Sequence, residues 1–272
     1  MEITFLGTSA AEHYPALWCR CDNCERARNS GGRNIRTTSS IHFNKTCLID
    51  FTSEEFIQAK KFGIDIINSE FLLVTHSHED HFSPHLLRWR IQNASNIPVL
   101  YTWGNQCVYN SLMKGLRGFS LEDCAIKYEI LKPYREYTYK NIHFVPLIAS
   151  HEDINNSPGL IYWVGVDNHS FLYAVDSGPY NDRTRDYIRG LHVDAVIMEE
   201  TFGFKNGNKN HMNWDSAMRE VQFFMESGIF KNSPKVYWTH MSPHSNPLQY
   251  EMEKMLQGSF VVPAYDGMTI TI

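Results

Sequence analysis

Short apolar runs, separated by polar or glycine-containing segments, recur along the whole chain and predict β-strands. The run Phe71-Leu72-Leu73-Val74 is continuously apolar over four residues, which is typical of a buried strand. In chain order the predicted strands are Ile3 to Leu6, Ser40 to Ile49, Phe71 to Thr75, Val99 to Thr102, Ile142 to Leu147, Leu160 to Val166, Ser170 to Ala174, Ala195 to Met198, Lys235 to Thr239 and Met268 to Ile272.

Helical periodicity lies between several of these runs. The clearest helix covers Trp214 to Ser227, where Asn213 or Asp215 can cap the start and Gly228 can end it. Two further helices are predicted over Ser53 to Phe62 and Pro84 to Gln92. Because strands and helices are interspersed and no repeat or linker divides the chain, we expect one α/β domain over residues 1–272, built as a layered sandwich.

The composition narrows the classes of function. The 272 residues are 43% hydrophobic and 20% charged, with 25 Lys and Arg against 30 Asp and Glu, a formal net charge of −5. No block of basic residues could follow a nucleic-acid backbone, so nucleic acid is not an expected partner. We see no signal peptide and no apolar run of membrane-spanning length, so we expect a cytoplasmic protein without a membrane partner.

Four residues of the kinds that bind metal ions follow the buried run directly, in the segment His76-Ser77-His78-Glu79-Asp80-His81. A strand end is rigid while the loop after it can turn, so three imidazoles and one carboxylate can converge on one point. These groups suit zinc, manganese and iron, and a pair of such ions is well adapted to hydrolysis. The segment therefore predicts a metallohydrolase.

Further candidate ligands follow later strands in the same way. His151 comes after the run that ends at Ile148, Asp176 after Phe171 to Val175, and His240 after Val236 to Trp238. A single histidine in such a place more often forms a hydrogen bond within a loop. Taken with the first segment, however, the repeated placement favours a site shared by several strand ends.

The pattern His-x-His-x-Asp-His with a later His, Asp and His resembles that of the metallo-β-lactamase superfamily. The resemblance implies an αββα sandwich with two metal ions at the edge where the two sheets meet, and a hydroxide bridging them as the nucleophile. It also implies that Asp80 orients this hydroxide or takes up its proton. The implied ligands are His76, His78 and His151 for one metal, Asp80, His81 and His240 for the second, and Asp176 for both.

Two positions disfavour particular branches of that superfamily. The diiron flavoproteins carry Glu where this chain has His78, and the zinc β-lactamases carry Cys where it has Asp176. We therefore expect neither redox chemistry nor hydrolysis of antibiotics.

Three of the six cysteines cluster in Cys19-Arg20-Cys21-Asp22-Asn23-Cys24. In a reducing compartment such a cluster indicates a metal site rather than disulfides. Three thiolates and one more ligand would hold a closed tetrahedral zinc, which leaves no position for a substrate and is therefore structural. We expect this zinc to fix a loop at about residues 11–28 against the loop after His240.

The chain resembles PhnP-like cyclic phosphate phosphodiesterases over nearly its whole length. Three segments carry this resemblance: the cysteine cluster, Asn210-His211-Met212-Asn213 and Tyr265-Asp266-Gly267-Met268. The resemblance implies that His211 contacts the substrate phosphate. It also implies a histidine as fourth ligand of Cys19, Cys21 and Cys24, separated from the last catalytic histidine by two residues. Here three residues separate His240 from His244, so His244 is the candidate and His13 the alternative.

The resemblance implies a phosphodiesterase for a small anionic phosphodiester such as 5-phosphoribosyl 1,2-cyclic phosphate. As an imidazolium, His211 could pair with the phosphate and donate a proton to the leaving oxygen, so Asp80 and His211 are the catalytic candidates. The implied cofactors are two manganese, zinc or iron ions and one structural zinc. An RNA-processing nuclease of the same superfamily and a non-hydrolytic PqqB-like protein are the alternatives, and a homodimer stays open.

Overall fold

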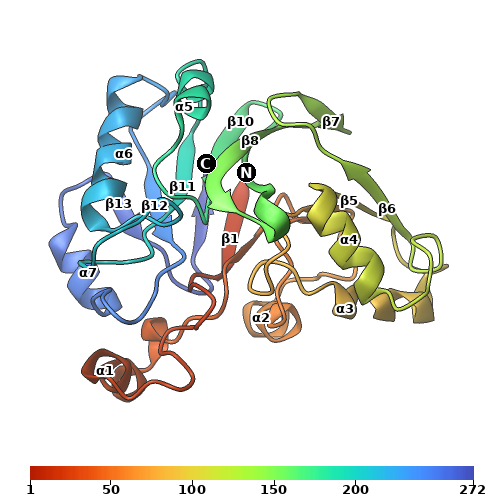
Figure 1. Cartoon of the computed structure of the whole chain (residues 1–272), viewed down its shortest axis with the longest axis horizontal. Helices are drawn as coiled ribbons and strands as arrows, with labels where there is room; N and C mark the ends of the chain where they lie inside the picture. The colour runs from red at the N-terminus through yellow and green to blue at the C-terminus, as the bar shows by residue number, and fades with distance from the viewer.

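The computed structural model describes all of residues 1–272 and contains two seven-stranded β-sheets packed face to face (Figure 1). In spatial order the first sheet consists of β14 (Thr269–Thr271), β1 (Glu2–Gly7), β2 (Ser40–Phe43), β3 (Cys47–Ile49), β4 (Phe71–Leu73), β5 (Leu100–Gly104) and β6 (Ile126–Ile130). The second consists of β13 (Val261–Pro263), β12 (Val236–Thr239), β11 (Ala195–Glu199), β10 (His169–Ala174), β9 (Pro158–Val166), β8 (Ile142–Glu152) and β7 (Tyr137–Tyr139).

Helices cover the outer face of each sheet (Figure 1). The first sheet is covered by α2 (Glu55–Phe62), α3 (Pro84–Leu87) and α4 (Gln106–Gly115), and the second by α5 (Asp182–Ile188), α6 (Trp214–Glu226) and α7 (Gln249–Met255). Helix α1 (Asp22–Ser30) stands apart at the lower edge of Figure 1. Short 3₁₀ turns occupy Gly32–Asn34, Arg88–Asn93 and Ile154–Asn156.

The continuously apolar strands are explained by this layering, because both faces of each sheet are buried. In β4 and the residue after it, Phe71 and Leu73 belong to the core between the sheets, whereas Leu72 and Val74 pack toward the helices. Phe43 of one sheet meets Phe171 of the other edge-on, with ring centroids 5.4 Å apart. The expected α/β sandwich is confirmed.

Strand direction brings many loops to one edge of the sandwich. Strands β3 to β6 are mutually parallel, and so are β10 to β13. Strand β8 is antiparallel to β9, which is antiparallel to β10, so β8 ends at the same side as β10. The carboxyl ends of parallel strands form the crevice in which open α/β sheets bind ligands.

Several elements differ from the sequence-based expectation. The run Ser40 to Ile49 is a hairpin, β2 and β3, whose turn is made by Asn44 and Lys45 in the left-handed region at φ 47° and 67°. The helix expected over Pro84 to Gln92 is α3 followed by a 3₁₀ segment. Helix α6 agrees with the expectation, and of its two candidate caps Asn213 is the one that acts, since its side chain accepts a hydrogen bond from the backbone N–H of Ser216. Strands β6, β7 and β13 and helices α1, α4, α5 and α7 were not predicted.

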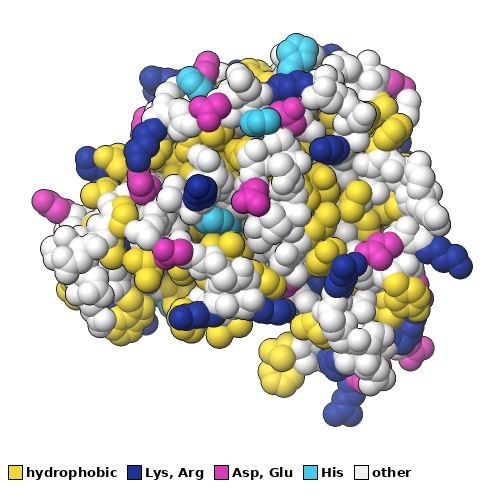
Figure 2. Space-filling view, turned by 180° about the vertical axis from the view of Figure 1, so that it is seen from behind, with side chains coloured by type: hydrophobic (Ala, Val, Ile, Leu, Met, Phe, Trp, Pro, Cys, Tyr) yellow, Lys and Arg dark blue, Asp and Glu magenta, His cyan; other side chains and the backbone are white.

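The surface carries no extended field of one charge on the face seen in Figure 2, where Lys and Arg side chains are dispersed among Asp and Glu. None of the helices combines the length and the apolar character that a membrane crossing requires.

Candidate metal centre

The seven residues predicted as ligands of the two-metal site meet at the carboxyl edge of the two sheets. The loop after β4 supplies the first four, β8 supplies His151, and the turns after β10 and β12 supply Asp176 and His240. They form two groups, in each of which the potential ligand atoms lie within 4.8 Å of one another. These groups are His76, His78, His151 and Asp176, and Asp80, His81, Asp176 and His240.

In the first group, imidazole nitrogens face one another. Nδ1 of His78 lies 3.0 Å from Nε2 of His76 and 3.2 Å from Nε2 of His151. Burial lowers the pKa of His78, and lowers that of His151 to about 4 despite the nearby Asp176 carboxylate. Both rings are therefore neutral near pH 7 and offer lone pairs. Three nitrogens and one carboxylate gathered so closely fit a cation better than a set of shared protons.

The second group repeats this arrangement. Nε2 of His81 lies 3.2 Å from Nε2 of His240, 3.3 Å from Oδ2 of Asp176 and 3.5 Å from Oδ2 of Asp80. Burial raises the pKa of Asp80, but the His81 and His240 rings lower it by more, so the carboxyl group stays ionised. Asp176 is held ionised in the same way and is the one residue that belongs to both groups.

Two of these residues adopt unusual backbone conformations. Asp176 has φ 57° and His240 has φ 60°, in the left-handed region that residues other than glycine rarely occupy. His240 stands directly after β12, and Asp176 stands two residues after the end of β10. Such strain is typical of functional sites, where the surrounding structure enforces it.

Three buried carboxylates that the sequence analysis did not single out hold the ligands in place. Oδ2 of Asp50 lies 2.8 Å from Nδ1 of His81, which leaves Nε2 of that ring for the centre. Asp50 also accepts hydrogen bonds from the backbone N–H and the hydroxyl of Thr75, at 2.8 and 2.9 Å. Carboxylates that orient metal-binding histidines in this way tune both ring position and basicity. Asp50 follows β3 directly, so the same strand-end rule would have found it.

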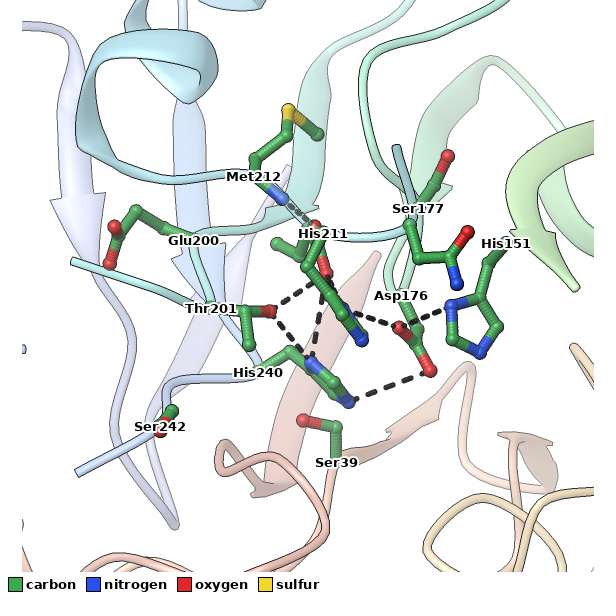
Figure 3. A network of polar contacts seen from close by, with 12 residues as sticks. Ser39, His151, Asp176, Ser177, Glu200, Thr201, His211, Met212, His240 and Ser242 are labelled. Carbon is green, nitrogen blue, oxygen red and sulfur yellow. Dashed lines mark hydrogen bonds and ion pairs between the residues drawn. The ribbon is translucent and has the colours of Figure 1, made fainter. Parts of the chain in front are cut away.

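Glu199, at the end of β11, is the second of these carboxylates and is fully buried. Its Oε2 lies 3.1 Å from Nδ1 of His211 and accepts a hydrogen bond from the Thr201 hydroxyl at 2.8 Å. That hydroxyl also lies 3.0 Å from Nδ1 of His240. Figure 3 shows His151, Asp176, His211 and His240 pointing toward one another. A dashed line in it joins the Thr201 hydroxyl to the His240 ring.

His211 lies beside both histidine groups and has a raised pKa. Burial lowers its pKa, but the carboxylates of Glu199 and Asp176 raise it to about 11. Nδ1 of His211 lies 3.1 Å from Oδ1 of Asp176, and the side chain keeps 22% of its surface exposed. The structure thus places a cationic donor beside the two groups, where a ligand can reach it.

The third carboxylate, Asp153, lies two residues after His151. Its oxygens accept hydrogen bonds from the backbone N–H of Ser77 at 3.0 Å and from the Asn105 amide at 2.9 Å. The loop between His76 and His78 is thereby tied to the end of β8.

The cysteine cluster forms a separate group at the N-terminal end of α1. Cys19, Cys21, Cys24 and His244 bring their ligand atoms within 4.8 Å of one another, and Sγ of Cys19 lies 3.8 Å from Nδ1 of His244. The Cys24 backbone N–H lowers the pKa of Cys21 to about 6, with help from the neighbouring thiols and His244. His13, the alternative fourth residue, instead pairs with Glu54, whose Oε1 lies 3.3 Å from Nε2 of the ring.

Two cavities open beside the two histidine groups. One of about 510 Å³ includes His151 in its wall, and one of about 420 Å³ includes Asp80. Both are polar, since side-chain amides line the first and serine hydroxyls line the second.

The sequence matches the family described as "Beta-lactamase superfamily domain" over residues 51–241, which includes every residue of the two histidine groups. No curated protein sequence matches the chain significantly.

Solved structures similar to this one include a diphosphatase of the PhnP family, with 18% identity and a TM-score of 0.75 over 99% of this chain and 96% of that one. Zinc-bound PqqB from Methylobacterium extorquens has 14% identity and a TM-score of 0.76 over the full length of both chains. The short form of human tRNase Z has 18% identity and a TM-score of 0.68 over 100% of this chain and 99% of its own. At these identities the likeness establishes the fold.

Proposed function

The chain belongs to the β-lactamase superfamily, and from this membership we propose that it is a metal-dependent phosphodiesterase with a dinuclear centre. Its substrate would be a small anionic phosphodiester, such as 5-phosphoribosyl 1,2-cyclic phosphate. The observation that carries the proposal is the pair of ligand groups sharing Asp176, with the cationic His211 beside them.

In this proposal the first metal is held by three histidines and the second by two histidines and Asp80. The close approach of ring nitrogens in each group fits such a role, since one cation between them would be bound by both rings. When bound, two divalent cations lower the pKa of a water molecule and offset charge on a phosphoryl group. Zinc, manganese and iron all suit this donor set.

His211 is the residue we assign to the phosphate itself. As an imidazolium held by Glu199 at 3.1 Å, it can pair with a phosphoryl oxygen and then donate a proton to the leaving oxygen. Asp80 lines the second cavity, where its carboxylate would orient a water molecule or take up its proton. Proton donor and proton acceptor would thus come from different loops around one phosphorus atom.

We propose that Cys19, Cys21, Cys24 and His244 hold a structural zinc. The lowered pKa of Cys21 favours the thiolate that zinc requires, whereas burial raises the pKa of Cys24 to about 12, so a bound cation would be needed to draw off its proton. His244 follows the turn that begins at His240, so the zinc would fasten the segment of residues 11–28 to the second sheet.

The names of two similar structures, a diphosphatase and a tRNase Z, support chemistry on phosphate compounds. The net charge of −5, the dispersed charges on the face seen in Figure 2 and the size of the two cavities favour a small substrate over folded RNA. Zinc-bound PqqB is also similar to this chain, so the alternative is a protein that binds metal without hydrolysing a phosphodiester.

A substrate panel tests the proposal. Metal-loaded protein is incubated with bis(p-nitrophenyl) phosphate, with 5-phosphoribosyl 1,2-cyclic phosphate and with a structured precursor transfer RNA. We expect hydrolysis of the two small diesters and an intact RNA. Cleavage of the RNA alone would favour an RNA-processing nuclease. The absence of any hydrolysis by protein that carries both metals would favour a non-hydrolytic, PqqB-like protein.

A further inference from the structure

The cavity beside His151 is a built pocket rather than a gap between loops. Three loops that carry functional residues form it: the end of β8, the turn after Asp176, and the segment leading to His211. The backbone N–H of Gly178 donates to the carbonyl of Ser150 at 3.3 Å, which joins the first two loops. Its volume of about 510 Å³ is within the range of small-molecule sites.

The third loop is fixed against the second by close backbone contact. A Cβ atom on Gly178 would lie 2.1 Å from the carbonyl oxygen of Lys209, so only glycine allows this approach. The side chain of Asn208 accepts hydrogen bonds from the backbone N–H groups of Asn210 and His211, at 2.8 and 2.9 Å. The backbone at Lys209 therefore holds a set position relative to Asp176 and His211.

The wall of the pocket is rich in amides and contains no Phe, Tyr or Trp. Asn181 and Asn208 are engaged in helix capping and loop bonds, whereas no hydrogen bond within the chain involves the side-chain amides of Asn156 and Asn210. An amide can both donate to and accept from a hydroxyl group. A nucleobase would find no aromatic surface to stack on, so the wall suits the hydroxyl groups of a sugar.

Lys209 is the only cationic side chain in this wall that lies outside the metal groups. Its Nζ lies 2.8 Å from Oε1 of Glu152, and the two side chains are 75% and 49% exposed. Such an exposed ion pair contributes little to stability, so Lys209 can leave it for a more highly charged anion. The pair spans the pocket between the loop of His151 and the loop of His211.

We propose that this pocket binds the non-reacting part of the substrate, and that Lys209 selects polyhydroxylated phosphodiesters bearing a second anionic group such as a phosphate. In the absence of substrate, Glu152 holds Lys209 in place and competes with that anion. This inference rests on the proposed phosphodiesterase function, which it deepens by assigning the charge and polarity of the substrate's far end.

The test compares ribose 1,2-cyclic phosphate with its 5-phosphorylated form, using the metal-loaded wild type and the variants Lys209→Gln and Glu152→Gln. Lys205→Gln is the matched control, because Lys205 lies in the same loop, is exposed, and is absent from the pocket wall. Metal content and melting temperature are measured for each variant. The readout is the ratio of kcat/KM for the two substrates.

We expect Lys209→Gln to lower the preference for the 5-phosphorylated substrate about tenfold or more, as loss of a charge-assisted contact requires. Glu152→Gln should raise that preference, because it frees Lys209, and Lys205→Gln should leave it unchanged. An equal preference in wild type and Lys209→Gln would overturn the inference while leaving the phosphodiesterase proposal intact.

A binding measurement keeps the two proposals separable. Isothermal titration of the same metal-loaded proteins with ribose 5-phosphate and with ribose does not depend on turnover. The inference requires tighter binding of ribose 5-phosphate than of ribose by the wild type, and loss of that difference in Lys209→Gln. An undiminished difference in Lys209→Gln would overturn it, whether or not either diester is hydrolysed.

Discussion

The hydroxyl of Ser77 donates to Oδ1 of Asp153 over 2.5 Å, while the Ser77 backbone N–H donates to Oδ2 over 3.0 Å. Ser77 lies between His76 and His78, and Asp153 lies two residues beyond His151, so one buried carboxylate connects the three histidines of the first group. The order of the metal loop therefore depends on a residue from the other sheet.

The variant Asp153→Asn should weaken metal binding at the first group. Its amide would present N–H groups where Ser77 and Asn105 already donate, so at least one of these contacts would be lost. Changes to residues that orient ligands lower metal affinity about 10- to 100-fold. Titration with manganese after dialysis against a chelator checks this, and an affinity equal to that of the wild type would remove Asp153 from the positioning role.

The variant His211→Ala should lower turnover about 10²- to 10⁴-fold, the range for loss of a proton donor, while metal content stays at the wild-type level. Glu199→Gln should also lower turnover, because it removes the negative charge that keeps His211 protonated. Its effect should be smaller, since the donor itself remains. His143→Ala provides the control, because this exposed ring lies on β8 and belongs neither to the histidine groups nor to the two cavities beside them. A turnover unaffected by His211→Ala would exclude His211 from the reaction.

Glu55 should make the protein less stable as the pH rises. Burial, with the nearby Asp50 and Glu54 carboxylates, raises its pKa from 4.5 to about 8, and its Oε1 has no hydrogen-bond partner. Below pH 4.5 the folded and unfolded states are both protonated at this group. Between pH 4.5 and about 8 only the unfolded state loses its proton, so the free energy of unfolding falls across this window.

Urea unfolding of the wild type and Glu55→Gln at the two ends of that window checks this prediction. The variant has no proton to lose at this position, so its stability should depend less steeply on pH. Other titrating groups are common to both proteins and cancel in the comparison. Identical pH dependence in the two proteins would contradict the shifted pKa.

The variant Cys21→Ser should lose one zinc ion per chain and melt at a lower temperature, while the metals at the histidine groups remain. The zinc would join α1 to the segment that contains His244, so its loss frees that segment before it disturbs the sandwich core. Cys107→Ser is the matched control, because this thiol lies outside the cluster. Loss of activity at an unchanged melting temperature would instead assign the cysteines to catalysis.

The positions of the candidate ligands followed from the sequence because each stands directly after a strong strand pattern. His76 to His81 are contiguous, and His151, Asp176 and His240 each follow a buried apolar run. Parallel strands necessarily end at one edge, so ligands far apart in sequence were expected to meet there.

The supporting carboxylates Asp50 and Glu199 also stand at strand ends, but the sequence does not show which histidine each one contacts, because that depends on how the loops fold back. Glu199 acts on His211, 12 residues later, and Asp50 on His81, 31 residues later. The choice between His244 and His13 likewise needed the path of the loop after His240. Edge elements were missed for a local reason: β6 is mostly exposed, and β13 has only three residues.

The most direct test of the central claim is the metal stoichiometry of phosphodiesterase activity. Protein stripped of the active-site metals but retaining the cysteine-bound zinc is titrated with manganese, while hydrolysis of bis(p-nitrophenyl) phosphate is followed. The two groups that share Asp176 predict that activity rises until two equivalents are bound per chain and then stays constant. Full activity with one equivalent or none, or no activity after two are bound, would contradict the account.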